Sequence, residues 1–147
     1  MLFLFLTMRI LLILLLVSTN CVSQSSILGK WTTIDDESGK ARSIVEIVER
    51  SSKVFGKIIK LYPNPEEDPD PICDKCPADD ARFNKKIIGL EIIRDMIWEE
   101  KTLAEGTILD PESGKIYQCK IWLEGEDLKV RGYWGPFFRT QTWKKVH

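Results

Sequence analysis

Short alternating runs of apolar and polar residues, separated by turn residues, continue from Leu28 to the end of the chain. This alternation is typical of strands with one buried face, and no helical spacing of apolar residues persists for long. Residues 95–103, which carry Trp98, fit either a short helical turn or a hairpin. The pattern predicts strands over residues 27–34, 43–50, 54–62, 86–93, 104–109, 115–123, 128–133 and 138–145.

Most of these strands are joined by short turns. Residues 35–39 and 110–114 have turn composition, because aspartate caps its own backbone and glycine accepts a positive φ. About eight strands in a meander that closes on itself leave no exposed sheet edge. We therefore predict an all-β protein, a single up-and-down antiparallel β-barrel.

The connection between the third and fourth predicted strands is different. Residues 63–85 hold five prolines, the acidic segment Glu66–Asp70 and the pair Cys73 and Cys76. Irregular loops of this length are uncommon in small domains and are often functional. A local Cys73–Cys76 disulfide is the favoured interpretation; thiol exchange and a zinc site are the alternatives, and we assign no metal site.

The first 23 residues have the order of a secretory signal peptide, which leaves residues 24–147 as one β-barrel domain. Arg9 precedes the apolar run 10–17, which is too short to span a membrane, and small residues follow. We expect cleavage after Ser23 and export to the periplasm or out of the cell, where cysteines tend to pair. In the alternative, Cys21 becomes the lipidated first residue of a membrane-anchored lipoprotein.

Two side chains are expected to close one end of the barrel. Small up-and-down barrels often carry a Gly-x-Trp on the first strand and an arginine on the last, which here are Gly29-x-Trp31 and Arg139. The Arg139 guanidinium would lie over the Trp31 indole in a cation–π contact.

An ordered series of motifs along the chain resembles one family. The chain is identified as a member of the 2147 family of domains of unknown function, which are small exported bacterial proteins. The resemblance covers nearly all of residues 24–147 and implies a lipocalin-like or streptavidin-like barrel with no established activity. Many members of the wider lipocalin and fatty-acid-binding superfamily hold one small apolar molecule. The motifs are Gly29-x-Trp31 with Asp35, Gly56-Lys57-Ile58, Cys73-x-x-Cys76, Gly89-Leu90, Gly106-x-Ile108-x-Asp110-Pro111, Gly114-Lys115-x-Tyr117, Arg131-Gly132-Tyr133 and Arg139-Thr-Gln-Thr-Trp143.

Aromatic and arginine side chains on the later strands are the candidate ligand contacts. Aromatic rings stack on apolar groups, and a planar guanidinium binds carboxylates. Arg131 and Tyr133 share one face of their strand and Val130 and Gly132 share the other, and the sequence leaves open which face is inward. The predicted ligand-binding residues are Arg131, Tyr133, Trp134, Trp98 and Tyr117.

Catalytic and nucleic-acid signals are weak. The single histidine is His147, and no nucleophile elbow, phosphate-binding loop or cofactor motif is present. The 21 basic and 22 acidic residues form no basic stripe, which argues against nucleic acid. We predict an exported, non-enzymatic barrel that binds a small apolar or amphipathic molecule. The alternatives are an envelope interaction module that docks through Glu66–Asp70 and, less favoured, an enzyme with two catalytic carboxylates.

Overall fold

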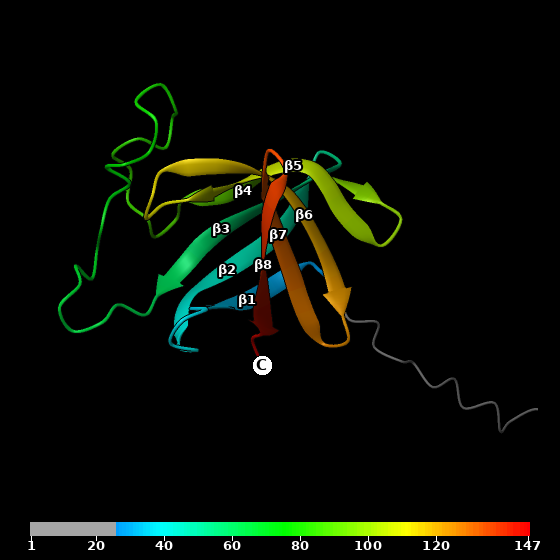
Figure 1. Ribbon diagram of the computed structural model, residues 1–147, viewed down its shortest axis with the longest axis horizontal. Coiled ribbons are helices and arrows are strands. Elements are labelled where there is room, and N and C mark those ends of the chain that lie inside the picture. Colours follow the sequence, from blue (N-terminus) through cyan, green and yellow to red (C-terminus); the bar gives the residue numbers. More distant parts are fainter. Residues whose placement is uncertain (1–25) are drawn as a thin grey trace, which may run out of the picture.

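Eight antiparallel strands follow one another around a closed barrel (Figure 1). The computed structural model describes residues 26–147, so the predicted signal peptide and Cys21 lie outside the described residues. Strand β1 pairs with β8 through Trp31–Lys145 and Thr32–Lys144, which closes the sheet. The predicted all-β, up-and-down barrel is confirmed. The strands are β1 (Gly29–Ile34), β2 (Ala41–Arg50), β3 (Lys53–Leu61), β4 (Glu91–Glu99), β5 (Thr102–Asp110), β6 (Lys115–Glu124), β7 (Asp127–Trp134) and β8 (Phe137–Lys145).

The connections between strands gather at two ends of the barrel, because successive strands run in opposite directions. The β1–β2, β5–β6 and β7–β8 turns and the long β3–β4 connection lie at one end, which we call the open end. The β2–β3, β4–β5 and β6–β7 turns lie at the other, together with the start of β1 and the end of β8. We call this second end the closed end.

Large apolar side chains fill the barrel interior toward the closed end. Trp31 is fully buried, and its indole Nε1 donates a hydrogen bond to the carbonyl of Ile27 at 2.8 Å. Gly106 leaves room for a neighbour that a larger residue would exclude, because a Cβ there would lie 2.4 Å from Met96 Sδ. The other fully buried side chains of this region include Val45, Ile47, Val54, Leu103, Ile121 and Leu128.

The β3–β4 connection is irregular, as expected, but it runs on to residue 90 (Figure 1). The predicted strand over residues 86–93 was therefore wrong in its first part. Gly89 takes a φ of +92°, which an extended strand does not allow, and its N–H donates to the Ile58 carbonyl at 2.7 Å. Residues 95–103 form the β4–β5 hairpin, so the hairpin alternative is the right one.

An internal disulfide and two contacts with the barrel fix the 62–90 connection in place. The predicted Cys73–Cys76 disulfide is present, and both cysteines are buried. Gly114 in the β5–β6 turn meets the connection so closely that a Cβ there would lie 1.7 Å from the Lys75 carbonyl oxygen. The buried Arg82 donates to Asp80 Oδ2 at 2.7 Å and to the Glu91 carbonyl at 3.2 Å.

Over residues 26–147, no helix is long and apolar enough to cross a membrane.

Candidate functional site

A cavity of about 710 Å³ extends from the open end of the barrel down to Trp143. Ligand pockets in proteins commonly have volumes of about 300–1,000 Å³, so this one is large enough for a small molecule. Its lower wall is apolar, because alternate residues of successive strands point inward there. The apolar side chains of this wall include Ile58, Ile92, Ile108, Val130 and Trp143.

A few uncharged polar groups interrupt the apolar wall. Thr33 and Ser43, which pair across β1 and β2, join their hydroxyl oxygens at 2.7 Å. The side-chain oxygen of Gln141 accepts a hydrogen bond from Trp143 Nε1 at 3.1 Å. Tyr117 of β6 also lines the cavity and is half-buried. Such groups give a ligand a few fixed hydrogen-bonding partners inside an otherwise apolar site.

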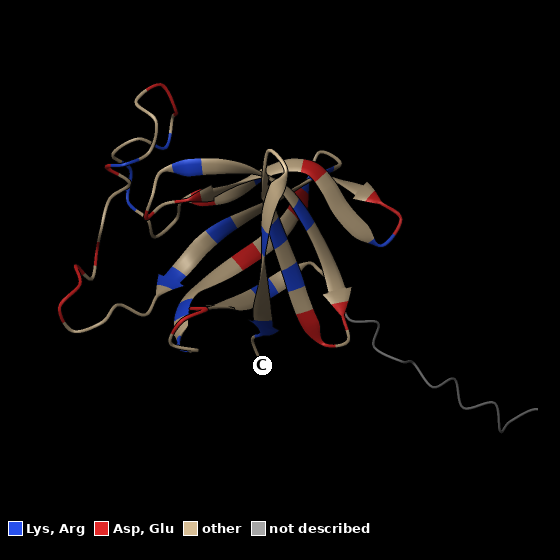
Figure 2. Ribbon diagram, viewed as in Figure 1, with Lys and Arg blue, Asp and Glu red and all other residues tan. Residues whose placement is uncertain are grey.

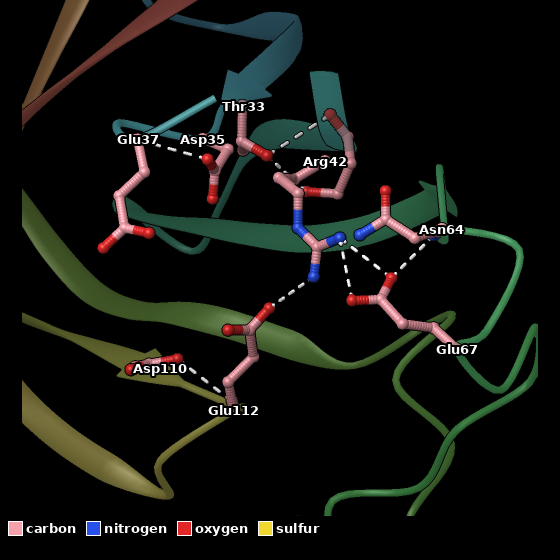
Figure 3. A network of polar contacts seen from close by, with 9 residues as sticks. Thr33, Asp35, Glu37, Arg42, Asn64, Glu67, Asp110 and Glu112 are labelled. Carbon is pink, nitrogen blue, oxygen red and sulfur yellow. Dashed lines mark hydrogen bonds and ion pairs between the residues drawn. The ribbon is translucent and has the colours of Figure 1, made fainter. Parts of the chain in front are cut away.

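Arg42 on β2 connects three segments at the rim of the cavity (Figure 3). Its Nη1 lies 2.9 Å from Glu67 Oε2 in the β3–β4 connection, and its Nη2 lies 2.7 Å from Glu112 Oε1 in the β5–β6 turn. Glu67 also accepts a hydrogen bond from the Asn64 N–H at 2.7 Å. The hydrogen bond from Arg42 is the main cause that lowers the pKa of Glu67, and the Glu67 carboxylate in turn raises the pKa of Arg42. The charged Arg42 and Glu67 side chains therefore link the β3–β4 connection to the barrel.

Three further carboxylates that line the cavity are also engaged. Asp35 accepts hydrogen bonds from the N–H groups of Ser38 and Glu37, and the Ser38 N–H is the main cause that lowers the pKa of Asp35. Asp36 accepts a hydrogen bond from Arg139 Nε at 2.9 Å. Asp110 caps its own turn by accepting from the N–H of Glu112 and from the Ser113 hydroxyl.

Comparison with known proteins identifies the family. Residues 29–145 match the model of a family described as uncharacterized proteins conserved in bacteria (DUF2147). The chain belongs to this family. No curated protein matches the sequence significantly. Among solved structures, the chain is similar to protein HP1028 from the human pathogen Helicobacter pylori, described as belonging to the lipocalin family, with a TM-score of 0.69 and 21% identity over 84% of this chain and 85% of that one. This likeness supports the lipocalin-like barrel.

Two of the five predicted ligand contacts line the cavity of this DUF2147 protein. Tyr117 lies in its wall and Trp134 at its mouth. Arg131 and Tyr133 point outward, because Val130 and Gly132 occupy the inward positions of β7. Arg131 instead lies against the outer rings of Trp122 and Phe138, at 5.0 and 4.3 Å from their centroids, and donates to the Thr140 hydroxyl at 2.6 Å.

Trp98 lies away from the cavity as well. It pairs with Leu103 beside the β4–β5 turn, at the closed end, where it packs against the buried core. The predicted ligand role for Trp98 therefore has no support from its position.

The predicted contact between Trp31 and Arg139 is not formed. Trp31 pairs with Lys145, whose Nζ lies 4.7 Å from the centre of the indole ring. Arg139 is six residues earlier on the same strand, which places it roughly 20 Å away, at the open end. Its partner there is Asp36. A cation does cover the closed-end tryptophan, but the last strand supplies it from a different position.

The sequence interpretation missed the residues that organise the rim. Arg42 is separated from Glu67 by 25 residues and from Glu112 by 70, so no local pattern connects them. The inward position of Gln141 could have been predicted, because this residue lies on the same face of β8 as the buried Trp143. Strand parity anchored on that tryptophan would have placed Gln141 in the cavity.

Two further chemical features of the described residues concern reactivity. Cys119 is a free, buried thiol outside the cavity lining, and burial raises its pKa to about 12. Within the described part of the chain, no group of three or more His, Cys, Asp or Glu side chains is arranged to hold a metal ion.

Proposed function

We propose that this protein is an exported, non-enzymatic barrel that holds one small amphipathic molecule in its open-end cavity. The observation that carries the proposal is the cavity of about 710 Å³ with an apolar wall and a charged rim. A barrel of eight strands is wide enough to enclose one small ligand. The lipocalin-like fold of the chain is consistent with this role.

The division of the cavity into two zones indicates an amphipathic ligand. An apolar tail would lie against Ile58, Val130 and Trp143, where burial of its surface is favourable. A polar head would remain beside Arg42 and the carboxylates around it, since burying a polar group without partners is costly. Tyr117 and Gln141 lie between these zones as hydrogen-bonding groups for the middle of the ligand.

The state of five carboxylates that line the cavity supports binding rather than catalysis. A general acid needs a pKa near the working pH, whereas the pKa values of Asp35 and Glu67 are lowered. Asp36, Asp110 and Glu112 are engaged by an arginine or by turn groups. A pair of carboxylates with these partners is poorly suited to glycoside chemistry, which needs one protonated acid.

Export is supported by two features. The buried Cys73–Cys76 disulfide is of a kind that persists in oxidising compartments. The first 23 residues have the composition of a secretory signal peptide.

The interaction module with the acidic segment as its docking element is the weaker proposal. Glu67 and Asp70 are already paired within the chain, with Arg42 and Lys86 respectively. These pairs leave the segment less charge to offer a partner.

A binding titration with a cavity-filling variant tests the proposed function. The probe is N-phenylnaphthylamine, an uncharged dye that fluoresces in apolar sites. We expect saturable one-to-one binding to the wild type, weakened about tenfold or more by Gln141→Phe, because its ring occupies space inside the cavity. The control is Thr142→Phe, whose side chain leaves the opposite face of β8.

Absence of saturable binding by the wild type would contradict the proposed function. Equal losses in Gln141→Phe and Thr142→Phe would also contradict it, because binding would then not depend on the cavity.

A further inference from the structure

The β7–β8 turn carries the most exposed large apolar side chains of the described residues. Trp134 and Phe137 are each 68% exposed and Phe138 is 60% exposed. Gly135 and Pro136 form the turn between them, with Gly135 at a φ of +55°. We call residues 134–138 the aromatic finger. Its exposure needs an explanation, because clustered apolar surface on a folded protein commonly marks an interaction site.

The rings of the finger point in more than one direction. Trp134 pairs with Phe137 across the turn, so these two rings share the inner face of the hairpin. Phe138 follows Phe137 directly and therefore leaves the outer face, where it pairs with Tyr133. A flat protein partner would cover one of these faces and leave the other in water. A fluid apolar phase would cover both at once.

The finger itself is uncharged, and cations flank it. In Figure 2 the β7–β8 turn is tan throughout, whereas acidic residues mark several other turns. Lys115 Nζ lies 5.6 Å from the centre of the Trp134 ring, and the Arg131 guanidinium lies 4.3 Å from that of Phe138. Aromatic rings with neighbouring Lys or Arg are typical of segments at a membrane interface, where the rings enter the headgroup region and the cations remain in water.

We propose that the aromatic finger docks the barrel on a lipid membrane surface. Trp134, Phe137 and Phe138 also line the mouth of the cavity, so docking would place that mouth against the lipid. The cavity lining is acidic on balance, with seven carboxylates against Arg42, Lys75 and Arg139, and this disfavours strongly anionic membranes. The lipid is therefore a zwitterionic one, held through apolar contact rather than through charge. This inference goes beyond ligand binding and does not depend on it.

Vesicle co-sedimentation with the mature protein tests the proposal. The vesicles are a zwitterionic mixture of phosphatidylethanolamine and phosphatidylcholine, and intact mass confirms that the protein has lost residues 1–23 and carries no lipid. We expect W134S/F137S/F138S to bind roughly tenfold more weakly or worse, because interfacial binding scales with buried apolar area. Ile97→Ser is the matched control, since Ile97 is 40% exposed but lies on β4 toward the closed end. Its vesicle binding should equal that of the wild type.

Two further variants separate docking from misfolding. W134S/F137S keeps the contact between Phe138 and Arg131 and should still lose most of the binding. Trp134→Phe should keep vesicle binding while reducing the lipid-induced blue shift of tryptophan emission.

No vesicle binding by the wild type, or equal binding by the wild type and the serine variants, would overturn the proposal. Self-association that the same variants abolish would also overturn it, because a second copy would then be the occupant of the finger. Dye binding in the cavity is measured without vesicles, so its failure and the failure of docking are distinguishable.

Discussion

The two ends of this barrel are made from similar hairpins, but the tryptophan at one end is buried and the tryptophan at the other end is exposed. Trp31 at the closed end is 0% exposed, satisfied by the Ile27 carbonyl and covered by Lys145. Trp134 at the open end is 68% exposed. A β-barrel can separate stability from recognition in this way. Each strand contributes residues to both ends, and the side chains at one end can change without affecting those at the other. The closed end is packed with buried side chains, whereas the open end leaves a cavity and exposed rings.

The strand connections follow the same division. Short turns join the strands at the closed end, and the β2–β3 turn needs only Ser51 and Ser52, both at positive φ. The open end carries the 62–90 connection, which is fixed by a disulfide and by ion pairs. Longer connections of this kind commonly carry function on a rigid scaffold.

Removing the closed-end tryptophan should have the largest effect. Trp31→Ala deletes a fully buried ring and should lower the free energy of unfolding by about 3–5 kcal/mol, measured by urea denaturation. Trp134→Ala at the open end should change it by no more than about 0.5 kcal/mol. Similar losses of unfolding free energy in the two variants would contradict the division of stability between the two ends.

Asp80→Asn should have an intermediate and pH-dependent effect. The hydrogen bond from Arg82 is the main cause that lowers the pKa of Asp80 from 3.8 to about 2. A lowered carboxyl pKa stabilises the fold above pH 3.8, and this stabilisation is lost as the pH falls from there through about 2. At pH 7 the variant should lose about 2 kcal/mol, and its difference from the wild type should vanish near pH 2.

Amide hydrogen exchange would locate that loss. In Asp80→Asn, protection should fall first in the 62–90 connection and remain in the β6–β7 hairpin of the closed end. Equal loss at both ends would show that the connection is not an independent unit.

Arg42→Ala should change binding kinetics more than stability. Its ion pairs lie at a solvent-accessible rim, so unfolding should change by less than about 1 kcal/mol. Release of Glu67 and Glu112 should loosen the rim and speed dissociation of the dye severalfold in stopped-flow experiments. Arg50→Ala is the control on the same strand, since Arg50 pairs with Glu91 away from the cavity. An equal change in the dye dissociation rate of both variants would show that the rim network has no special role.

The smallest effect is expected at Cys119, whose thiol should not react in the folded protein. Its thiol is buried and its pKa is raised to about 12, so the reactive thiolate is scarce at pH 8. A water-soluble disulfide reagent should modify the urea-unfolded protein but not the native one. Rapid native modification would show that the barrel below the cavity opens to solvent.

Most of the fold could be predicted from the sequence, because strands and turns depend on local signals. Alternation and turn composition around residues 35–39 and 110–114 predicted the closed meander, and the spacing of Cys73 and Cys76 predicted the local disulfide. Residues 86–90 were misassigned, because Ile87, Ile88 and Leu90 imitate a strand that the positive φ of Gly89 prevents.

The candidate site was less predictable because it depends on long-range register. Arg131 and Val130 are equally plausible from composition, and only the placement of Val130 in the cavity wall settles which of them points inward. Arg42 meets partners 25 and 70 residues away, and its role follows from barrel closure rather than from any motif.

The most direct test is an amide NMR titration of residues 24–147 with N-phenylnaphthylamine. We predict saturable shift changes at the open-end cavity, centred on Tyr117, Val130, Gly132 and Gln141, with little change at Leu103 and Ile121 of the closed end. Changes absent from these cavity residues, or centred on the closed end, would contradict the claim that the open end is the binding site.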